Sequence, residues 1–161
     1  NSFAKCGLSP VTHPLLINLR KLTMNEHSYI KAIHKMLPST VYKWKINDNF
    51  HGGVADAYYS GSGGDLWIEY KYVSNPPKRS STEIKTCLSL QQLHWLKSRQ
   101  EEGRRVVLVI GMQAPVGMRF KDNLIITDFS QKVTIDTFSS SAIDKRGVAE
   151  FIMSSCLEEV A

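Results

Sequence analysis

The sequence has little of what marks secreted, zinc-binding and membrane proteins. Its 161 residues contain three cysteines, Cys6, Cys87 and Cys156, which lie far apart and match neither a zinc-binding spacing nor a disulfide framework. No apolar run approaches the roughly twenty residues of a membrane span, and no signal peptide is visible at the start given. We therefore expect a protein of the reducing cytoplasm, which would be the host cell's cytoplasm if the source is viral.

Other absences narrow the function further. No Gly-x-Ser-x-Gly segment occurs, which argues against a hydrolase with a nucleophile triad, and no internal repeat or low-complexity tract is present. The composition is that of a globular protein, with 42% hydrophobic and 22% charged residues. One domain is expected at this length. The net charge of +5 suits a polyanionic partner such as nucleic acid.

Two aromatic-rich apolar runs separated by a glycine-rich turn organise the chain. They cover residues 53–59 and 66–73, and residues 60–64 between them predict the turn of a β-hairpin. Because side chains alternate along a strand, every second residue of the later run points to the same side. One of the two resulting sets is a predicted core face: Leu66, Ile68, Tyr70 and Tyr72.

Three charged residues interrupt this apolar hairpin. Glu69 and Lys71 share one face of the second strand, and Asp56 in the first strand can reach the same patch. One interpretation is a cross-strand ion pair that contributes little to stability. The other is a site for metal-dependent phosphodiester cleavage, in which the carboxylates hold Mg²⁺ and the lysine orients water or stabilises the transition state. The spacing alone leaves both interpretations open.

The order of these residues resembles a nuclease signature. Asp56, then twelve residues, then Glu69-Tyr70-Lys71 is similar to the D…ExK pattern of the PD-(D/E)XK nuclease superfamily, although Ala55 stands where proline is expected. Within it the chain looks most like the small stand-alone VRR-Nuc type of phages and mobile elements, from about Glu26 to about Ile110. The supporting segments are Gly53-Val54-Ala55-Asp56, Trp67-Ile68-Glu69-Tyr70-Lys71, and Leu88-Ser89-Leu90-Gln91-Gln92 leading into Trp95-Leu96.

The resemblance implies a Mg²⁺- or Mn²⁺-dependent endonuclease acting on DNA, with RNA as an open alternative. It implies that Asp56 and Glu69 hold the metal with the backbone carbonyl of Tyr70, and that Lys71 orders or activates the attacking water. It also implies an α/β fold in which a mixed central β-sheet is flanked by helices, as in a restriction-endonuclease-like core. Duplex cutting by a small one-site domain would favour a homodimer.

Two supporting residues of the resembled site also have structural explanations. Glu26 opens a helix predicted over residues 24–37 with Asn25 as N-cap, where an acidic side chain interacts favourably with the helix dipole. Gln92 lies on the mostly apolar side of a helix predicted from Ser89 to about residue 102, where it can cap a strand end. The resemblance instead places both side chains in the catalytic site, beside the metal.

Basic residues are expected to hold the nucleic-acid backbone, with a solvated surface as the alternative. Some lie on a strand predicted over 41–46 and others in the loop that leaves the catalytic strand. The loop that follows the strand at 41–46 contains Gly52-Gly53, which permits either close approach to a phosphate or a tight connection to the next strand. The candidates are Lys43, Lys45, His51, Lys78, Arg79 and Lys85.

The remaining segments complete one predicted domain. Residues 104–111 predict a buried central strand that returns parallel to its neighbour after a crossover helix. We expect an N-terminal arm over 1–23, a catalytic core over 24–111, and C-terminal strands and a closing helix over 112–161. Within the last part the predicted elements are strands at 124–127 and 132–136 and a helix at 141–159.

Two other function classes stay open. A nucleic-acid-binding module on the same fold would bind without cutting even in Mn²⁺. A basic protein-interaction or inhibitory factor would show a salt-insensitive affinity and no binding to DNA, because phosphate contacts are strongly salt-dependent.

Overall fold

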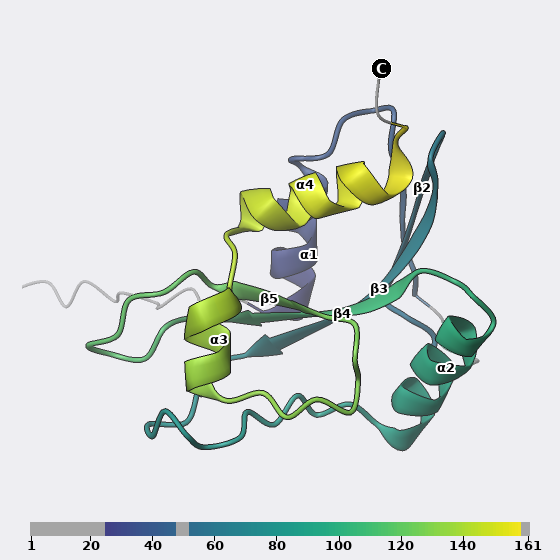
Figure 1. Ribbon diagram of the computed structural model, residues 1–161. Coiled ribbons are helices and arrows are strands. Elements are labelled where there is room, and N and C mark those ends of the chain that lie inside the picture. The colour runs from purple at the N-terminus through teal and green to yellow at the C-terminus, as the bar shows by residue number, and fades with distance from the viewer. Residues whose placement is uncertain (1–24, 48–51, 159–161) are drawn as a thin grey trace, which may run out of the picture.

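The computed structural model describes residues 25–47 and 52–158, so the predicted N-terminal arm and His51 lie outside the described residues. A five-stranded sheet of order β1-β2-β3-β4-β5 has helices on both faces (Figure 1). The α/β class predicted from the sequence is confirmed. The elements are α1 (Glu26–His34), β1 (Tyr42–Lys45), β2 (Ala57–Gly61), β3 (Gly64–Val73), α2 (Leu90–Glu101), β4 (Val106–Met112), β5 (Asn123–Ile126), α3 (Ile135–Ser141) and α4 (Lys145–Cys156).

The sheet is mixed. Antiparallel pairing joins β1 to β2, β2 to β3 and β4 to β5, whereas β3 and β4 run parallel. A parallel pair needs a long crossover connection, and α2 lies within that connection, as the order of helix and strand predicted. Strand β4 is buried along its whole length because it has a neighbour on each edge and a core cluster on each face.

Two apolar clusters hold the layers together. Helices α1 and α4 cover one face of the sheet, where Ile33 and Ile152 pack with Ile68 and Tyr70 of β3. Helix α3 covers the other face, where Phe138 packs with Ile110. Burial of a large apolar side chain contributes about 1.5–3 kcal/mol, so these clusters fix β3 and β4 at the centre. No helix in the described ranges is long and apolar enough to cross a membrane.

Side-chain caps set where the helices begin. Asn25 accepts a hydrogen bond from the backbone N–H of Ser28 at 2.8 Å, and Ser89 accepts one from Gln92 at 3.1 Å. Each satisfies a donor that the first turn of a helix leaves without a partner. Both residues were the predicted N-caps, and both predictions are confirmed.

The C-terminal prediction was wrong in two places. Residues 132–136 form no strand; Thr134 makes one isolated bridge with Glu83 and instead caps α3, accepting from the backbone N–H of Thr137. The last helix begins at Lys145 rather than at residue 141, because Asp144 caps it by accepting from Gly147 at 2.7 Å. The predicted apolar stripe of this helix, Val148, Ile152 and Cys156, is buried.

The first strand of the hairpin also begins later than predicted, at Ala57. Gly53 has φ +95°, and a Cβ added there would lie 2.8 Å from backbone atoms of Gln91. The glycines therefore let this loop pass against the first turn of α2, which favours the tight connection over the phosphate loop. The hairpin turn shortens to Ser62-Gly63, between strands that end at Gly61 and begin at Gly64.

A pair of glycine variants separates close packing from backbone strain. Gly103 also has a positive φ, +79°, but a Cβ there would meet nothing within 4 Å. We expect Gly103→Ala to lower the free energy of unfolding by about 1 kcal/mol, and Gly53→Ala to lower it by about 2–3 kcal/mol because overpacking is added. Urea unfolding measures both. Equal losses would show that the contact with Gln91 contributes nothing.

Candidate functional site

Glu69 lies at the centre of β3 and is 0% exposed. The pairing of β2 with β3 ends at Ala57 opposite Ile68, so Asp56 follows in register opposite Glu69, just outside β2 rather than within it as predicted. The carboxylate of Asp56 accepts a hydrogen bond from the backbone N–H of Tyr70 at 2.8 Å. This bond replaces the ladder contact that β2 no longer supplies, and it holds the two carboxylates side by side.

The two oxygens of Glu69 have different surroundings. Lys71 Nζ lies 2.7 Å from Glu69 Oε1, and the side-chain amide of Gln92 donates to the same oxygen. Glu69 Oε2 is buried and has no hydrogen-bond partner among the described residues. A buried polar atom without a partner is costly, so this oxygen is available as an acceptor.

Gln92 connects α2 to this carboxylate. Its side-chain oxygen accepts from the backbone N–H of Ser89 at 3.0 Å, which completes a capping box. Its amide nitrogen is thereby directed at Glu69. The structural alternative for Gln92 was that it caps the end of a strand. In the structure it instead takes part in the cap of its own helix, α2. Gln92 thus has a capping role and a contact with the predicted site.

Helix α1 brings further charge to the site. Burial raises the pKa of Glu26, the nearby charge of Asp56 raises it further, and Lys71 and Lys45 oppose this shift. Lys45 Nζ lies 2.7 Å from His27 Nδ1 in the first turn of α1. Three carboxylates and two ammonium groups therefore influence one another at this end of the sheet.

Burial dominates the titration of the central carboxylates. It raises the pKa of Glu69 to about 7, with Asp56 adding to the rise and Lys71 opposing it. Burial likewise raises the pKa of Asp56, against the lowering effects of the Tyr70 N–H and of Lys71. For Lys71, burial lowers the pKa, but the hydrogen bond to Glu69 and the surrounding carboxylates outweigh it, so the net shift is upward.

The donor set fits a hard divalent cation with few protein ligands. In the described part of the chain no three His, Cys, Asp or Glu side chains come close enough to form a metal cage. Asp56, Glu69 and a backbone carbonyl remain, which suits Mg²⁺ because it keeps several waters. The N–H of Tyr70 faces Asp56, and the carbonyl of a strand residue points to the same edge as its N–H. The partnerless Glu69 Oε2 is the open acceptor.

The two predicted basic residues of β1 make separate contacts. Lys43 Nζ lies 3.4 Å from the carbonyl of Leu37, beyond the C-terminal end of α1, whereas Lys45 reaches the N-terminal end of that helix. Exposed positions on the connection between β3 and α2 are occupied by Lys78, Arg79 and Lys85. Contact of these three with nucleic acid stays a prediction.

A hydrogen-bond chain beneath the site was not foreseen from the sequence. His34 Nε2 lies 2.8 Å from the hydroxyl of Tyr59, and that hydroxyl lies 2.7 Å from the hydroxyl of Tyr70. The chain satisfies polar atoms in the core between β2, β3 and α1. The available signal was the presence of Tyr70, rather than an aliphatic residue, at a predicted core position of the second hairpin strand.

Comparisons with known proteins give a likeness at the level of structure. No protein-family model and no curated protein matches the sequence. Among solved structures, the chain is similar to Hjc of Archaeoglobus fulgidus, a Holliday junction resolvase from an archaeal hyperthermophile, with a TM-score of 0.46 and 14% identity. The match covers 79% of this chain and 97% of that chain. A likeness of this size carries no argument about activity.

The pKa of Glu69 gives a stability test in metal-free buffer. The folded state holds this proton up to about pH 7, whereas an unfolded glutamate loses it near pH 4.3. Stability is therefore favoured at low pH and falls as pH rises between these values, by about 4 kcal/mol. Glu69→Gln should lack this loss and exceed the wild type in free energy of unfolding at pH 8. Urea unfolding in EDTA at several pH values measures it; parallel pH profiles would contradict it.

Proposed function

We propose that this chain is a divalent-metal-dependent endonuclease that hydrolyses phosphodiester bonds in DNA. The observation that carries the proposal is the buried Glu69, whose Oε2 has no partner among the described residues, beside Asp56 and 2.7 Å from Lys71. These are the residues that resemble the PD-(D/E)XK signature. The choice of DNA, of the VRR-Nuc type and of a phage or mobile-element source rests on that resemblance.

In the proposed mechanism Asp56, Glu69 and the carbonyl of Tyr70 hold Mg²⁺ or Mn²⁺. When bound, the cation would lower the pKa of a bound water and neutralise charge that develops on the phosphate. Asp56 is held in place by the N–H of Tyr70. Glu69 is held by Gln92, so one oxygen is fixed while the other has no partner among the described residues. This preorganisation removes the need to rearrange ligands during the reaction.

Lys71 acts in this mechanism as a cationic donor. Its net pKa shift is upward, so the ammonium stays protonated at neutral pH and cannot serve as a general base. It would orient the attacking water through an N–H bond and stabilise the negative charge of the phosphate transition state. Glu26 would be a further acidic contact at the margin of the site, influenced by the same lysine.

The cluster also bears on the other function classes. A catalytically silent binding module has no need to keep two carboxylates and a lysine together in a buried position, where desolvation is expensive. A protein-interaction factor would not require Glu69 to be buried. Neither class explains why Glu69 Oε2 is buried without a partner among the described residues. We therefore prefer the catalytic hypothesis to these two.

Cleavage assays test the proposal directly. Plasmid, linear and branched DNA would be incubated with Mg²⁺, Mn²⁺ or EDTA. We expect cleavage with either metal and none in EDTA, and a loss of at least about 100-fold for Lys71→Ala and Glu69→Ala, because transition-state stabilisation is removed. Lys132→Ala is the matched control, since Lys132 is exposed and its Nζ lies 4.0 Å from Glu83 Oε2 instead. Equal cleavage by all variants of confirmed fold would remove the hypothesis.

Metal binding can be tested without activity. A ligand that binds only the folded state stabilises it by about 2.7 kcal/mol at a hundredfold excess over Kd. Mg²⁺ or Mn²⁺ should therefore raise the melting temperature of the wild type, and the rise should be absent in Asp56→Asn and Glu69→Gln. Thermal unfolding followed by circular dichroism measures the shift. A similar rise in both variants would place the metal elsewhere.

A further inference from the structure

A row of aromatic side chains crosses the face of the sheet that carries Glu69. Strand pairing sets Trp44 opposite Tyr58 and Tyr58 opposite Trp67, so these three residues share one face. The ring centroids of Tyr58 and Trp67 lie 4.7 Å apart, and those of Trp67 and Trp95 on α2 lie 5.4 Å apart. We call Trp44, Tyr58, Trp67 and Trp95 the aromatic row. It contains all three tryptophans of the chain.

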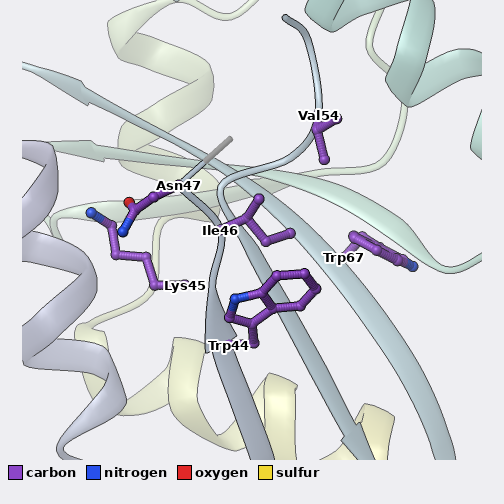
Figure 2. Close-up of a pocket in the computed structure, with 6 residues that line it drawn as sticks. All are labelled: Trp44, Lys45, Ile46, Asn47, Val54 and Trp67. Carbon is purple, nitrogen blue, oxygen red and sulfur yellow. The ribbon is translucent and has the colours of Figure 1, made fainter. Parts of the chain in front are cut away.

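A pocket opens at the β1 end of the aromatic row. It has a volume of about 370 Å³ and is lined by Trp44, Lys45, Ile46, Asn47, Val54 and Trp67. Figure 2 shows the indole rings of Trp44 and Trp67 next to each other, with Ile46 and Val54 above Trp44 and with Lys45 and Asn47 on the other side of the strand. A volume of this order is in the range of small-ligand pockets, and an apolar wall with polar groups at its border suits a flat heteroaromatic ring.

The aromatic row adjoins the proposed catalytic site. Trp67 precedes Glu69 by two residues on the same face of β3, a separation of about 6.5–7 Å along the strand. On α2, Trp95 follows Gln92 by nearly one turn, and these two residues contact Trp67 and Glu69 respectively. A chain of nucleotides whose phosphate lies at Glu69 would therefore pass over the row.

Exposure and charge favour nucleotides as the occupant. Trp44 is 50% exposed, and its neighbour Tyr42 is 60% exposed, although large aromatic side chains are usually buried. A cation accompanies the row, because Arg99 lies 6.0 Å above the ring of Trp95. Aromatic faces interleaved with positive charge bind unpaired bases, because every base can stack and the cations attract the phosphates. Bases in a regular duplex are stacked on each other and cannot use such faces.

We propose that the aromatic row and its pocket bind unpaired nucleotides of DNA, so that the preferred substrate has a single-stranded segment beside the cleaved phosphate. The proposal rests on the proposed function for the chemistry at Glu69. The stacking itself requires no metal. Binding in EDTA therefore tests it separately from cleavage.

Tryptophan fluorescence gives a direct readout, because every tryptophan belongs to the row. The wild type in EDTA would be titrated with oligothymidylate, with a duplex of equal length, and with an oligomer of equal length that carries abasic sites. We expect quenching by oligothymidylate and much weaker quenching by the other two probes. Quenching that is equal for the abasic oligomer would show binding through phosphates alone and would overturn the proposal.

Anisotropy of a labelled oligothymidylate then measures affinity. Trp44→Ala removes a stacking partner and should weaken the affinity for oligothymidylate about tenfold, whereas Trp44→Phe should keep most of that affinity. Met36→Ala is the matched control, since Met36 is 47% exposed and outside the row. An unchanged affinity in Trp44→Ala would overturn the proposal. A change of oligomeric state in that variant, measured by sedimentation, would also overturn it, because the row would then belong to an interface with a second copy or another protein. Intact stacking with no cleavage under any metal would instead defeat only the proposed function.

Discussion

The site depends on the interaction of one buried carboxylate, Glu69, with two donors. A charged side chain in the interior is costly because it loses hydration. Lys71 and Gln92 offset part of this cost, yet both contact Oε1, and Asp56 adds repulsion. The arrangement is therefore poor as a stabilising ion pair. A group whose pKa is raised by burial and by a charged neighbour is a candidate for a functional site.

The packing of α2 against β3 also assembles this site. The helix meets β3 through Gln92 on Glu69 and through Trp95 on Trp67. The Ser89 cap fixes the amide orientation of Gln92, and Gly53 lets the preceding loop pass close to the first turn. A change that displaces the start of α2 would therefore disturb the carboxylate without touching it.

Local patterns in the sequence predicted the elements that local physics decides. Alternation assigned the faces of β3 correctly, and short polar residues marked the caps at Asn25 and Ser89. The segment around Val133 and Ile135 alternates like a strand, but the Thr134 cap and the packing of α3 outweighed that pattern. Lys43 and Lys45, two residues apart on β1, reach opposite ends of α1, a difference that strand alternation does not indicate. The burial of Glu69 depends on neighbours far along the chain, so no local pattern could indicate it.

The uneven covering of the sheet connects the site with the aromatic row. Helices α1 and α4 close one face, where the hairpin strands bury their tyrosines and aliphatic residues. On the other face α2 reaches β3 at Glu69 and Trp67, while the aromatic side chains of the edge strand β1 stay largely exposed. Glu69 thus lies where the covered part of the sheet meets the open part. A polyanion approaching over β1 would meet aromatic surface first and the carboxylates last, which is the order required if binding is to position a phosphate before it is cut.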